Sequence, residues 1–378
     1  MIEFVYEVAQ DLDEHYKRGG NQFPPGSLRT GLNYLDKVAQ GVKEDEFVLL
    51  VGRPGTGKTA LATEIILRNT QQNDWETKTG EKDGVAVWES HQGLLPIGVF
   101  SLEMSGKSLA KRLLFRQAGV SMGKWNQGFA TREDQDRLIR AGQVLRENKV
   151  WIDETPNQTI EQMASKARRW VEKYGIKLFV LDYVQIARWG RSRGDKVQDL
   201  TEISHTLVAL KKAMRVPWLV LAQMNKGIES AEQWRRPTLA DIKDCDALAA
   251  DADQVWMLHK PAPGKVKFKG EGEQQQRIPD RRQMEDDLIE RVCEAEQLEV
   301  TEWPRRVDCY VPKNRNGPLG NVELLFQSNK QTFDDWHDWA TTKDANWMNA
   351  GERVNAVAKR VARDVDDFGE VAAWAKGR

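Results

Sequence analysis

The chain has 378 residues, of which 40% are hydrophobic and 30% charged, and its formal net charge is −1. It is long enough to bury a core, and its near-neutral balance excludes a polycation, so any nucleic-acid partner must be held by a local basic patch. Its three cysteines lack metal-ligand spacing and no apolar run approaches a membrane span, which argues against a disulfide framework, a zinc site and a membrane protein. We therefore expect a cytoplasmic protein.

The first predicted element is an amphipathic helix over residues 3–18, whose apolar positions share one side. Gly19 and Gly20 end it, and a linker with two prolines follows. A lone helix cannot bury its apolar stripe by itself. It packs either on its own domain or on a neighbouring subunit, and the residues alone leave both arrangements open.

The next elements surround a phosphate-binding motif. Residues 46–51 are apolar after Glu46 and include two β-branched valines, as in a buried parallel strand, and residues 60–68 have helical spacing. Between them lies the pattern G-x-x-x-x-G-K-[ST], and this strand–loop–helix setting predicts a nucleotide triphosphate site rather than a chance glycine-rich turn. We expect Lys58 to reach the β- and γ-phosphates and the Thr59 hydroxyl to bind Mg²⁺. The predicted nucleotide-binding residues are Gly52, Arg53, Pro54, Gly55, Thr56, Gly57, Lys58, Thr59 and Ala60.

Strands and helices alternate along most of the remaining chain. This alternation predicts an α/β fold with a mostly parallel twisted sheet, helices on both faces and ligands at the carboxyl ends of the strands. Two polar, charged segments, residues 73–93 and 261–304, are typical of surface insertions. The predicted strands are 97–101, 150–153, 178–182, 217–223, 254–259 and 306–311, and the predicted helices are 106–119, 132–147, 159–173, 197–214 and, within the second insertion, 283–297.

Three polar side chains at the ends of predicted strands complete the candidate site. Asp182 is placed to orient Mg²⁺, Glu103 to act as the general base for a water attacking the γ-phosphate, and Gln223 to sense that phosphate. Taken singly, they have plainer interpretations as a capping acid, a helix N-terminal acid and an amide that closes a strand. Together with the phosphate loop they predict a hydrolase.

Five segments occur in the order seen in the C-terminal motor domain of DnaB-type replicative helicases, which the chain resembles over about residues 3–328. The resemblance implies a RecA-like fold, a homo-hexameric ring, and 5′→3′ movement on single-stranded DNA driven by ATP hydrolysis with Mg²⁺. The segments are Ser101-Leu-Glu-Met-Ser105, Ile152-Asp-Glu-Thr-Pro156, Leu181-Asp-Tyr-Val-Gln185, Ala222-Gln-Met-Asn-Lys226 and Lys313-Asn-Arg-Asn-Gly-Pro318.

The same resemblance assigns roles to particular residues. It makes Glu103 the catalytic base and directs Lys313 and Arg315 into the neighbouring subunit's ATP site, with Arg315 as the arginine finger. Standing alone, residues 313–318 would be a basic hairpin turn. It also implies that the helix over residues 3–18 is the family's linker helix and packs on the adjacent subunit. The predicted organisation is a linker helix at 1–20, an ATPase domain at 21–330 and a Trp-rich extension at 331–378.

The chain departs from the family pattern in three ways. It begins at the linker helix, without the family's N-terminal helical domain, as in a phage or mobile-element protein. The family's DNA-binding loop reads close to D-L-R-E-S-G, whereas this chain has Asp241-Ile-Lys-Asp-Cys-Asp246, so DNA contact by Lys243 and Asp244 is an open question. The insertions at 73–93 and 261–304 are longer than usual and have no assigned role.

A basic loop follows the strand that ends at Asp182. We expect this loop to face the ring centre and track DNA phosphates, with Trp189 offering a stacking face. The alternative is a solvated charged loop. Its predicted DNA-binding residues are Arg188, Arg191, Arg193 and Lys196.

The tail from Gln331 onward combines aromatic residues with acids and includes a predicted helix at 352–363. It suits a docking peptide for a loader, primase or polymerase, or equally a strap on its own domain. Two other functions stay open for the whole chain. One is a RecA/KaiC-like switch that assembles on single-stranded DNA without unwinding, and the other is a small-molecule kinase. The aromatic residues of the tail are Phe333, Trp336, Trp339, Trp347 and Trp374.

Overall fold

The computed structural model describes residues 27–70, 94–225, 235–244, 246–261, 280–296, 298 and 303–343, together with the backbone of 71, 74–82, 85–92, 266–269 and 276–279. The chain forms two compact units. The first contains the described residues up to Pro261 and Arg305–Asp335, and the second contains Ala262–Pro304 and the residues from Trp336 onward. The predicted helices at 3–18 and 352–363, and Trp347 and Trp374, lie outside the described residues.

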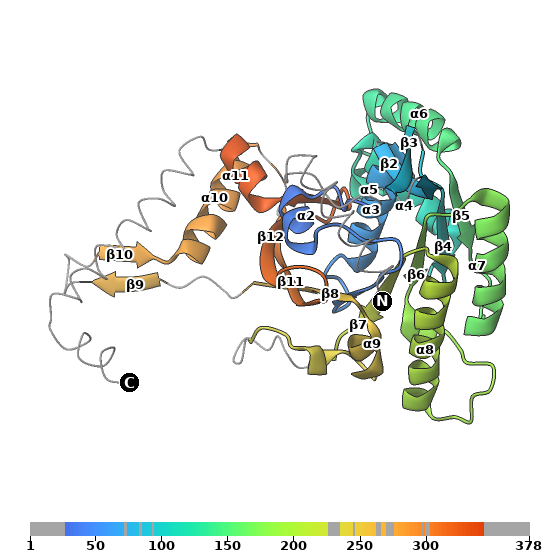
Figure 1. Ribbon diagram of the computed structural model, residues 1–378. Coiled ribbons are helices and arrows are strands. Elements are labelled where there is room, and N and C mark those ends of the chain that lie inside the picture. The colour runs from blue at the N-terminus through green and yellow to red at the C-terminus, as the bar shows by residue number, and fades with distance from the viewer. Residues whose placement is uncertain are drawn as a thin grey trace, which may run out of the picture. The chain divides into compact units, whose positions relative to one another are not determined.

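The first unit is built on a mixed sheet that has nine strands within the described residues, in the order β13-β12-β11-β8-β1-β7-β6-β4-β5 (Figure 1). The strands from β8 to β5 in this order pair in parallel, and β11, β12 and β13 are antiparallel at one edge. The strands are β1 (Phe47–Gly52), β4 (Ile97–Ser101), β5 (Val150–Asp153), β6 (Leu178–Asp182), β7 (Trp218–Gln223), β8 (Gln254–His259), β11 (Arg305–Asn314), β12 (Gly320–Gln327) and β13 (Thr332–Asp335).

Helices cover both faces of this sheet, which is why its central strands are continuously apolar. All six residues of β1 are buried. Val48 and Leu50 belong to the core on one face, with α3 and α4, whereas Leu49 and Val51 belong to the core on the other, with α7 and α8. The helices of the first unit are α2 (Asn33–Ala39), α3 (Lys58–Gln71), α4 (Gly106–Ala118), α5 (Met122–Asn126), α6 (Arg132–Glu147), α7 (Ile160–Tyr174), α8 (Lys196–Met214) and α9 (Asp246–Asp251), with 3₁₀ turns at Val184–Ile186 and Leu239–Asp241.

Local signals set several of these boundaries. Thr131 and Thr159 form capping boxes at the starts of α6 and α7, and Gly175 in the left-handed conformation ends α7. The predicted insertion at 73–93 contains an antiparallel hairpin of β2 (Asp74–Lys82) and β3 (Val85–Gln92). The prediction missed these strands because β2 is mostly polar and the short apolar run at the start of β3 does not alternate with polar residues.

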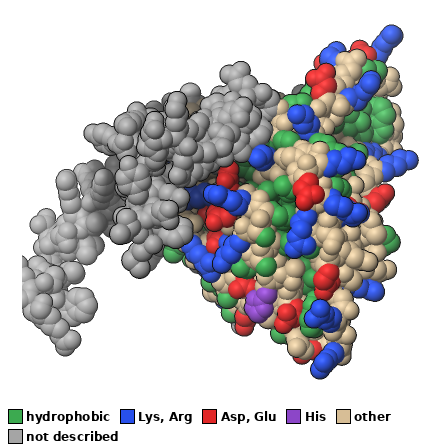
Figure 2. Space-filling view, turned by 45° about the vertical axis from the view of Figure 1, so that its right-hand side comes forward, with side chains coloured by type: hydrophobic (Ala, Val, Ile, Leu, Met, Phe, Trp, Pro, Cys, Tyr) green, Lys and Arg blue, Asp and Glu red, His purple; other side chains and the backbone are tan. Residues whose placement is uncertain are grey.

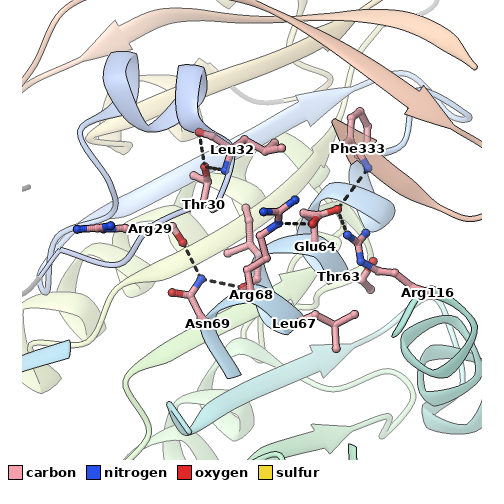
Figure 3. A network of polar contacts seen from close by, with 12 residues as sticks. Arg29, Thr30, Leu32, Thr63, Glu64, Leu67, Arg68, Asn69, Arg116 and Phe333 are labelled. Carbon is pink, nitrogen blue, oxygen red and sulfur yellow. Dashed lines mark hydrogen bonds and ion pairs between the residues drawn. The ribbon is translucent and has the colours of Figure 1, made fainter. Parts of the chain in front are cut away.

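A buried carboxylate fixes the helix that follows the phosphate loop (Figure 3). Glu64 of α3 forms ion pairs with Arg68 of the same helix and Arg116 of α4, and it accepts a hydrogen bond of 3.2 Å from the backbone nitrogen of Phe333. Phe333 belongs to the predicted C-terminal extension, yet it is fully buried in β13. The edge strand thereby holds α3 in place beneath the phosphate loop.

The second unit contains the antiparallel pair β9 (Val266–Lys269) and β10 (Gln276–Pro279), followed by α10 (Arg281–Ala295) and α11 (Trp336–Lys343). Helix α10 matches the helix predicted at 283–297. It is joined to α11 by an ion pair between Lys343 and Glu296. In α11 the rings of Trp336 and Trp339 stack at 5.5 Å.

The described residues also give information on the cysteines, on membrane-spanning helices and on metal-binding clusters. Cys293 and Cys309 are both free and buried. No helix in the described parts of the chain combines the length and apolarity needed to cross a bilayer. Within those parts, no cluster of three or more His, Cys, Asp or Glu side chains is arranged to bind a metal ion by itself.

Candidate nucleotide site

The phosphate loop connects the end of β1 to the first turn of α3. Gly55 and Gly57 have φ values of 81° and 95°, in the left-handed region that favours glycine. A Cβ atom on Gly57 would lie 2.7 Å from the ring of Phe333, whereas one on Gly55 would meet nothing within 4 Å. The loop therefore packs against the Phe333 ring at Gly57 and is open at Gly55, where a phosphate can approach the backbone.

The side chains of the loop are held in a fixed arrangement. Thr56 is buried and its Oγ1 donates to the carbonyl oxygen of Arg53 at 2.8 Å, closing the turn. The Lys58 Nζ donates to the carbonyl oxygens of Gly52 and Arg53 at 2.7 and 3.0 Å. Its ammonium group thus lies over the loop, as a triphosphate requires. Of the remaining predicted residues, Pro54 is exposed, and Ala60 is buried in the first turn of α3.

Pairing within the parallel sheet brings the predicted chemical groups to one edge. Gly52 at the end of β1 pairs with Gln223 at the end of β7, and Ser101 at the end of β4 pairs with Asp182 at the end of β6. The Thr59 hydroxyl donates to Asp182 Oδ2 at 3.0 Å. A hydroxyl and a carboxylate are hard oxygen donors of the kind that Mg²⁺ prefers, together with water and substrate phosphates. The residues present therefore fit a magnesium–nucleotide complex.

Burial perturbs the charges at this edge. Burial and, to a smaller extent, the Glu103 charge raise the pKa of Asp182 to about 6, against the lowering effects of Thr59, Lys58 and Arg112. Burial also lowers the pKa of Lys58 to about 8, against the charges of Asp182 and Glu103. Such opposed shifts are characteristic of functional sites that await a charged ligand. Arg112 of α4 was missed by the sequence analysis because an arginine in an amphipathic helix carries no local signal.

Glu103 lies just beyond β4, with an exposed side chain. Its backbone nitrogen and that of Leu102 donate to the Asp182 carbonyl at 3.4 and 2.8 Å. The segment is thus held beside the Asp182 strand while the carboxylate stays accessible to water. This placement suits a general base.

Gln223 forms hydrogen bonds with Gln185, the last residue of the 181–185 motif segment. The backbone nitrogen of Gln223 donates to Gln185 Oε1 at 3.1 Å, and Gln185 Nε2 donates to the carbonyl oxygens of Gln223 and Lys243, both at 3.3 Å. The backbone nitrogen of Lys243 donates in turn to the Gln223 carbonyl at 3.0 Å. The end of β7 is therefore connected directly to the altered 241–246 loop.

The two predicted DNA loops lie next to each other. Lys196 Nζ is 3.0 Å from Asp244 Oδ2, and Lys243 Nζ is 4.0 Å from the same atom. Arg188, Arg191 and Arg193 are exposed. On the face shown in Figure 2, Lys and Arg side chains are interspersed with Asp and Glu, in keeping with the near-zero net charge.

Trp189, which we expect to offer a stacking face, also contacts the body of the domain. Its side chain is half-buried and packs against the core on the α7 and α8 face of the sheet. A ring held in this way anchors the basic loop to the domain. Stacking of a base on the exposed part of this ring stays a prediction, as do phosphate contacts by the arginines.

Lys313 and Arg315 lie far from the phosphate loop of their own chain. Strand β11 is antiparallel to β8, so the end of β11 pairs with the start of β8, where Asn314 lies opposite Gln254. Gln254 in turn pairs with Val48 near the start of β1. The length of β1 therefore separates the two basic residues from the carboxyl edge of the sheet by roughly 17 Å. The structure does not bring them to the nucleotide site of the same chain.

The fold and this edge define a P-loop nucleotide-binding domain with the RecA-like fold, as predicted. Residues 27–335 match the DnaB-like helicase C terminal domain family, and the chain belongs to that family. The resemblance drawn from the motifs is thereby confirmed.

Curated relatives agree with this assignment. The chain is 27% identical over 88% of its length to the replicative DNA helicase DnaC of Bacillus subtilis (strain 168), covering 61% of that protein. It is 28% identical over 79% of its length to the replicative DNA helicase DnaB of Geobacillus stearothermophilus, covering 54% of it. The chain thus spans somewhat more than half the length of these relatives.

Solved structures share the fold. One solved ATPase domain aligns with a TM-score of 0.64 and 21% identity, over 87% of this chain and 97% of that one. A DnaB-like replicative helicase, whose structure was described with its interactions with primase, aligns with a TM-score of 0.61 and 20% identity, over 85% of this chain and 64% of that one.

Proposed function

We propose that this chain is the ATP-hydrolysing motor of a replicative DNA helicase, a ring of six copies that moves 5′→3′ on single-stranded DNA and unwinds duplex DNA. The supporting observation is the separation of two half-sites across the sheet. The phosphate loop, Glu103 and Asp182 lie at the carboxyl edge of the sheet. Lys313 and Arg315 lie at the opposite edge. A complete hydrolytic site then requires a second copy that presents its basic pair to the first copy's phosphate loop.

In this proposal each residue has a definite task. The loop nitrogens and Lys58 hold the phosphates, Thr59 and Asp182 hold Mg²⁺, and Glu103 takes the proton from the attacking water. Mg²⁺ supplies charge neutralisation at the β- and γ-phosphates when bound. Arg315 of the next copy stabilises the charge that develops in the transition state.

Gln223 links hydrolysis to DNA in the same scheme. Its side chain would contact the γ-phosphate, and its backbone is tied to Lys243 through Gln185. Loss of the γ-phosphate would then change the position of the 241–246 loop and of Lys196, which forms an ion pair with Asp244. The loop arginines would follow the DNA backbone without reading bases.

The parts outside the motor core extend the proposal. Residues 1–20 would form the linker helix that docks on the neighbouring copy, residues 21–330 together with β13 the ATPase domain, and the residues after Asp335 an extension available to a loader, primase or polymerase. Primase is a reasonable candidate because the DnaB-like helicase of similar fold was described with its interactions with primase.

The proposal is tested by strand displacement on a forked duplex with a 5′ tail, with Glu103→Gln as the inactive control. Displacement that requires ATP and Mg²⁺ supports it. Tight binding of single-stranded DNA with ATPase activity but no displacement would indicate the RecA/KaiC-like switch. A rate of ATP turnover that is the same with and without oligonucleotide would indicate a small-molecule kinase. A chain that stays monomeric with ATP, Mg²⁺ and oligonucleotide present would contradict the ring.

A further inference from the structure

Asp253, between α9 and β8, is buried and binds both the proposed arginine finger and two other elements. Its Oδ1 accepts a hydrogen bond of 3.1 Å from Arg315 NH1, and its backbone carbonyl accepts one of 3.0 Å from the Arg315 nitrogen. Its Oδ2 accepts from the backbone nitrogen of Phe47 at 2.7 Å and from the ammonium group of Lys211. One carboxylate therefore joins the finger to the start of β1 and to α8.

The exposure of these side chains shows that Asp253 and Lys211 form the buried side of the contact and Arg315 the exposed side. Asp253 and Lys211 are 8% and 6% exposed, whereas Arg315 is 50% exposed. Arg315 NH2 donates to the carbonyl oxygen of Ala250 at 2.9 Å. The guanidinium group is thus held from the protein side although half of the side chain's surface remains exposed, which is the arrangement needed to reach a neighbouring copy.

Removing the carboxylate would leave an excess of positive charge at this turn. Lys313 lies beside Arg315 and donates to the carbonyl oxygens of Ala249 and Ala250 at 2.8 and 2.7 Å. Burial lowers the pKa of Lys313, the Arg315 charge lowers it further, and Asp253 opposes both effects. Asp253 therefore balances a cluster of cations that would otherwise repel the finger from its position.

A second buried acid holds the far side of the same turn. Glu46 is 1% exposed, and its Oε1 accepts a hydrogen bond of 3.0 Å from Asn316 Nδ2. Its Oε2 accepts from Gln254 Nε2 at 2.8 Å and from the Lys43 nitrogen at 3.0 Å. Anchored on two sides, the turn presents Arg315 in one orientation, as a preorganised catalytic cation requires.

Helix α8 connects this turn to the basic loop. Among the described residues, polar contacts join α8 to the 244–253 segment at three levels: Lys196 with Asp244 at 3.0 Å, Ser204 with Asp251 at 2.7 Å, and Lys211 with Asp253. The helix has 19 residues and is therefore about 28 Å long. Its first turn follows the basic loop directly and its last turns contact Asp253, so a shift of the loop reaches the finger through one rigid element.

We propose that Asp253 is a positioning residue for Arg315, and that through Lys211 and α8 it makes the finger's orientation depend on the state of the basic loop. Stimulation of ATP hydrolysis by single-stranded DNA then passes through Asp253. This inference rests on the proposed role of Arg315 at the neighbouring copy's nucleotide site.

The test compares Asp253→Asn, Arg315→Ala, the double variant and a matched control in the full-length chain. Steady-state ATPase is measured with and without oligo-dT. Loss of a charge-assisted hydrogen bond should lower kcat of Asp253→Asn by about tenfold to a hundredfold, while KM for ATP changes by less than about threefold. The double variant should be no slower than Arg315→Ala alone, because both changes disable the same group.

The control is Asp153→Asn at the end of β5. It also breaks a buried Lys–Asp pair, since Lys166 Nζ lies 2.6 Å from Asp153 Oδ2 and the Asp153 side chain is 5% exposed. It should lower the melting temperature but leave kcat and the oligo-dT stimulation unchanged.

Different outcomes overturn different claims. If Arg315→Ala is slow but Asp253→Asn turns over ATP normally, or if the two losses multiply in the double variant, Asp253 does not act through Arg315. Normal turnover by Arg315→Ala would instead overturn the proposed finger. If Asp253→Asn does not fold, Lys211→Met replaces it. The ratio of rates with and without oligo-dT should then fall at least threefold, and an unchanged ratio refutes the coupling.

Discussion

Replacing Asp182 by asparagine tests the interpretation of the metal site through protein stability. Burial raises the pKa of this carboxyl from 3.8 to about 6. That difference corresponds to about 3 kcal/mol of destabilisation when the group is ionised at neutral pH without Mg²⁺. Asparagine keeps the size of the side chain and an oxygen that can accept the Thr59 hydrogen bond. It removes only the buried charge.

The sign of the effect follows from the direction of the pKa shift. A carboxyl with a raised folded-state pKa contributes stability that is fully present below pH 3.8 and lost as the pH rises through about 6. At pH 7.5 in EDTA, Asp182→Asn should therefore be more stable than the unaltered chain by up to about 3 kcal/mol, or about 4–5 °C in Tm for a chain of this length. The advantage should vanish near pH 4. Mg²⁺ with ATP should stabilise the unaltered chain and not the variant, which should hydrolyse no ATP.

The assay is a thermal melt of both chains at pH 4, 5, 6 and 7.5, in EDTA and again with Mg²⁺ and ATP. Glu103→Gln is the matched control because it removes an exposed carboxylate at the same sheet edge. A variant that is less stable than the unaltered chain at pH 7.5 in EDTA would refute the reasoning. So would an advantage that is equally large at pH 4.

Three further predictions concern the reaction and its partners. Glu103→Gln should lower ATP turnover by about a hundredfold or more while leaving ATP affinity nearly unchanged, measured by kinetics and by binding of a labelled nucleotide. Gly57→Ala should abolish the Mg²⁺–ATP thermal shift, since φ is 95° and the new methyl group would lie 2.7 Å from a buried ring; a normal shift would contradict the loop geometry. Alanine at three exposed loop positions should weaken oligo-dT binding at least tenfold and reduce the slope of log affinity against log salt by about 0.7 per lost contact, and an unchanged slope would show that the loop does not touch the strand. Those positions are Arg188, Arg191 and Arg193.

Much of the fold follows from local patterns. The strands at 97–101, 150–153, 178–182 and 254–259 begin and end where predicted, because a parallel strand covered on both faces is a short apolar run with polar ends. Helix α6 begins where predicted because Thr131 caps it. The phosphate loop is likewise local, since strand, glycines, lysine and helix are consecutive in the chain.

Elements that are polar or that depend on distant partners were not predicted. The β2–β3 hairpin lacks an alternating apolar pattern, and β12 and β13 are strands because each pairs with a neighbour at the sheet edge. Likewise, no local pattern predicted that Trp189 packs against the core on the α7 and α8 face of the sheet.

The sequence by itself predicted the chemical groups of the proposed site: a phosphate-binding loop, an acid for Mg²⁺ and a general base from residue type and spacing, and a basic pair from the resemblance to the family. Only the tertiary structure decided how they are distributed. Parallel pairing gathered Thr59, Asp182 and Gln223 at one edge, and the antiparallel course of β11 carried Arg315 to the other and onto Asp253. The reason is that strand direction and pairing depend on contacts between residues distant along the chain, which no local pattern specifies.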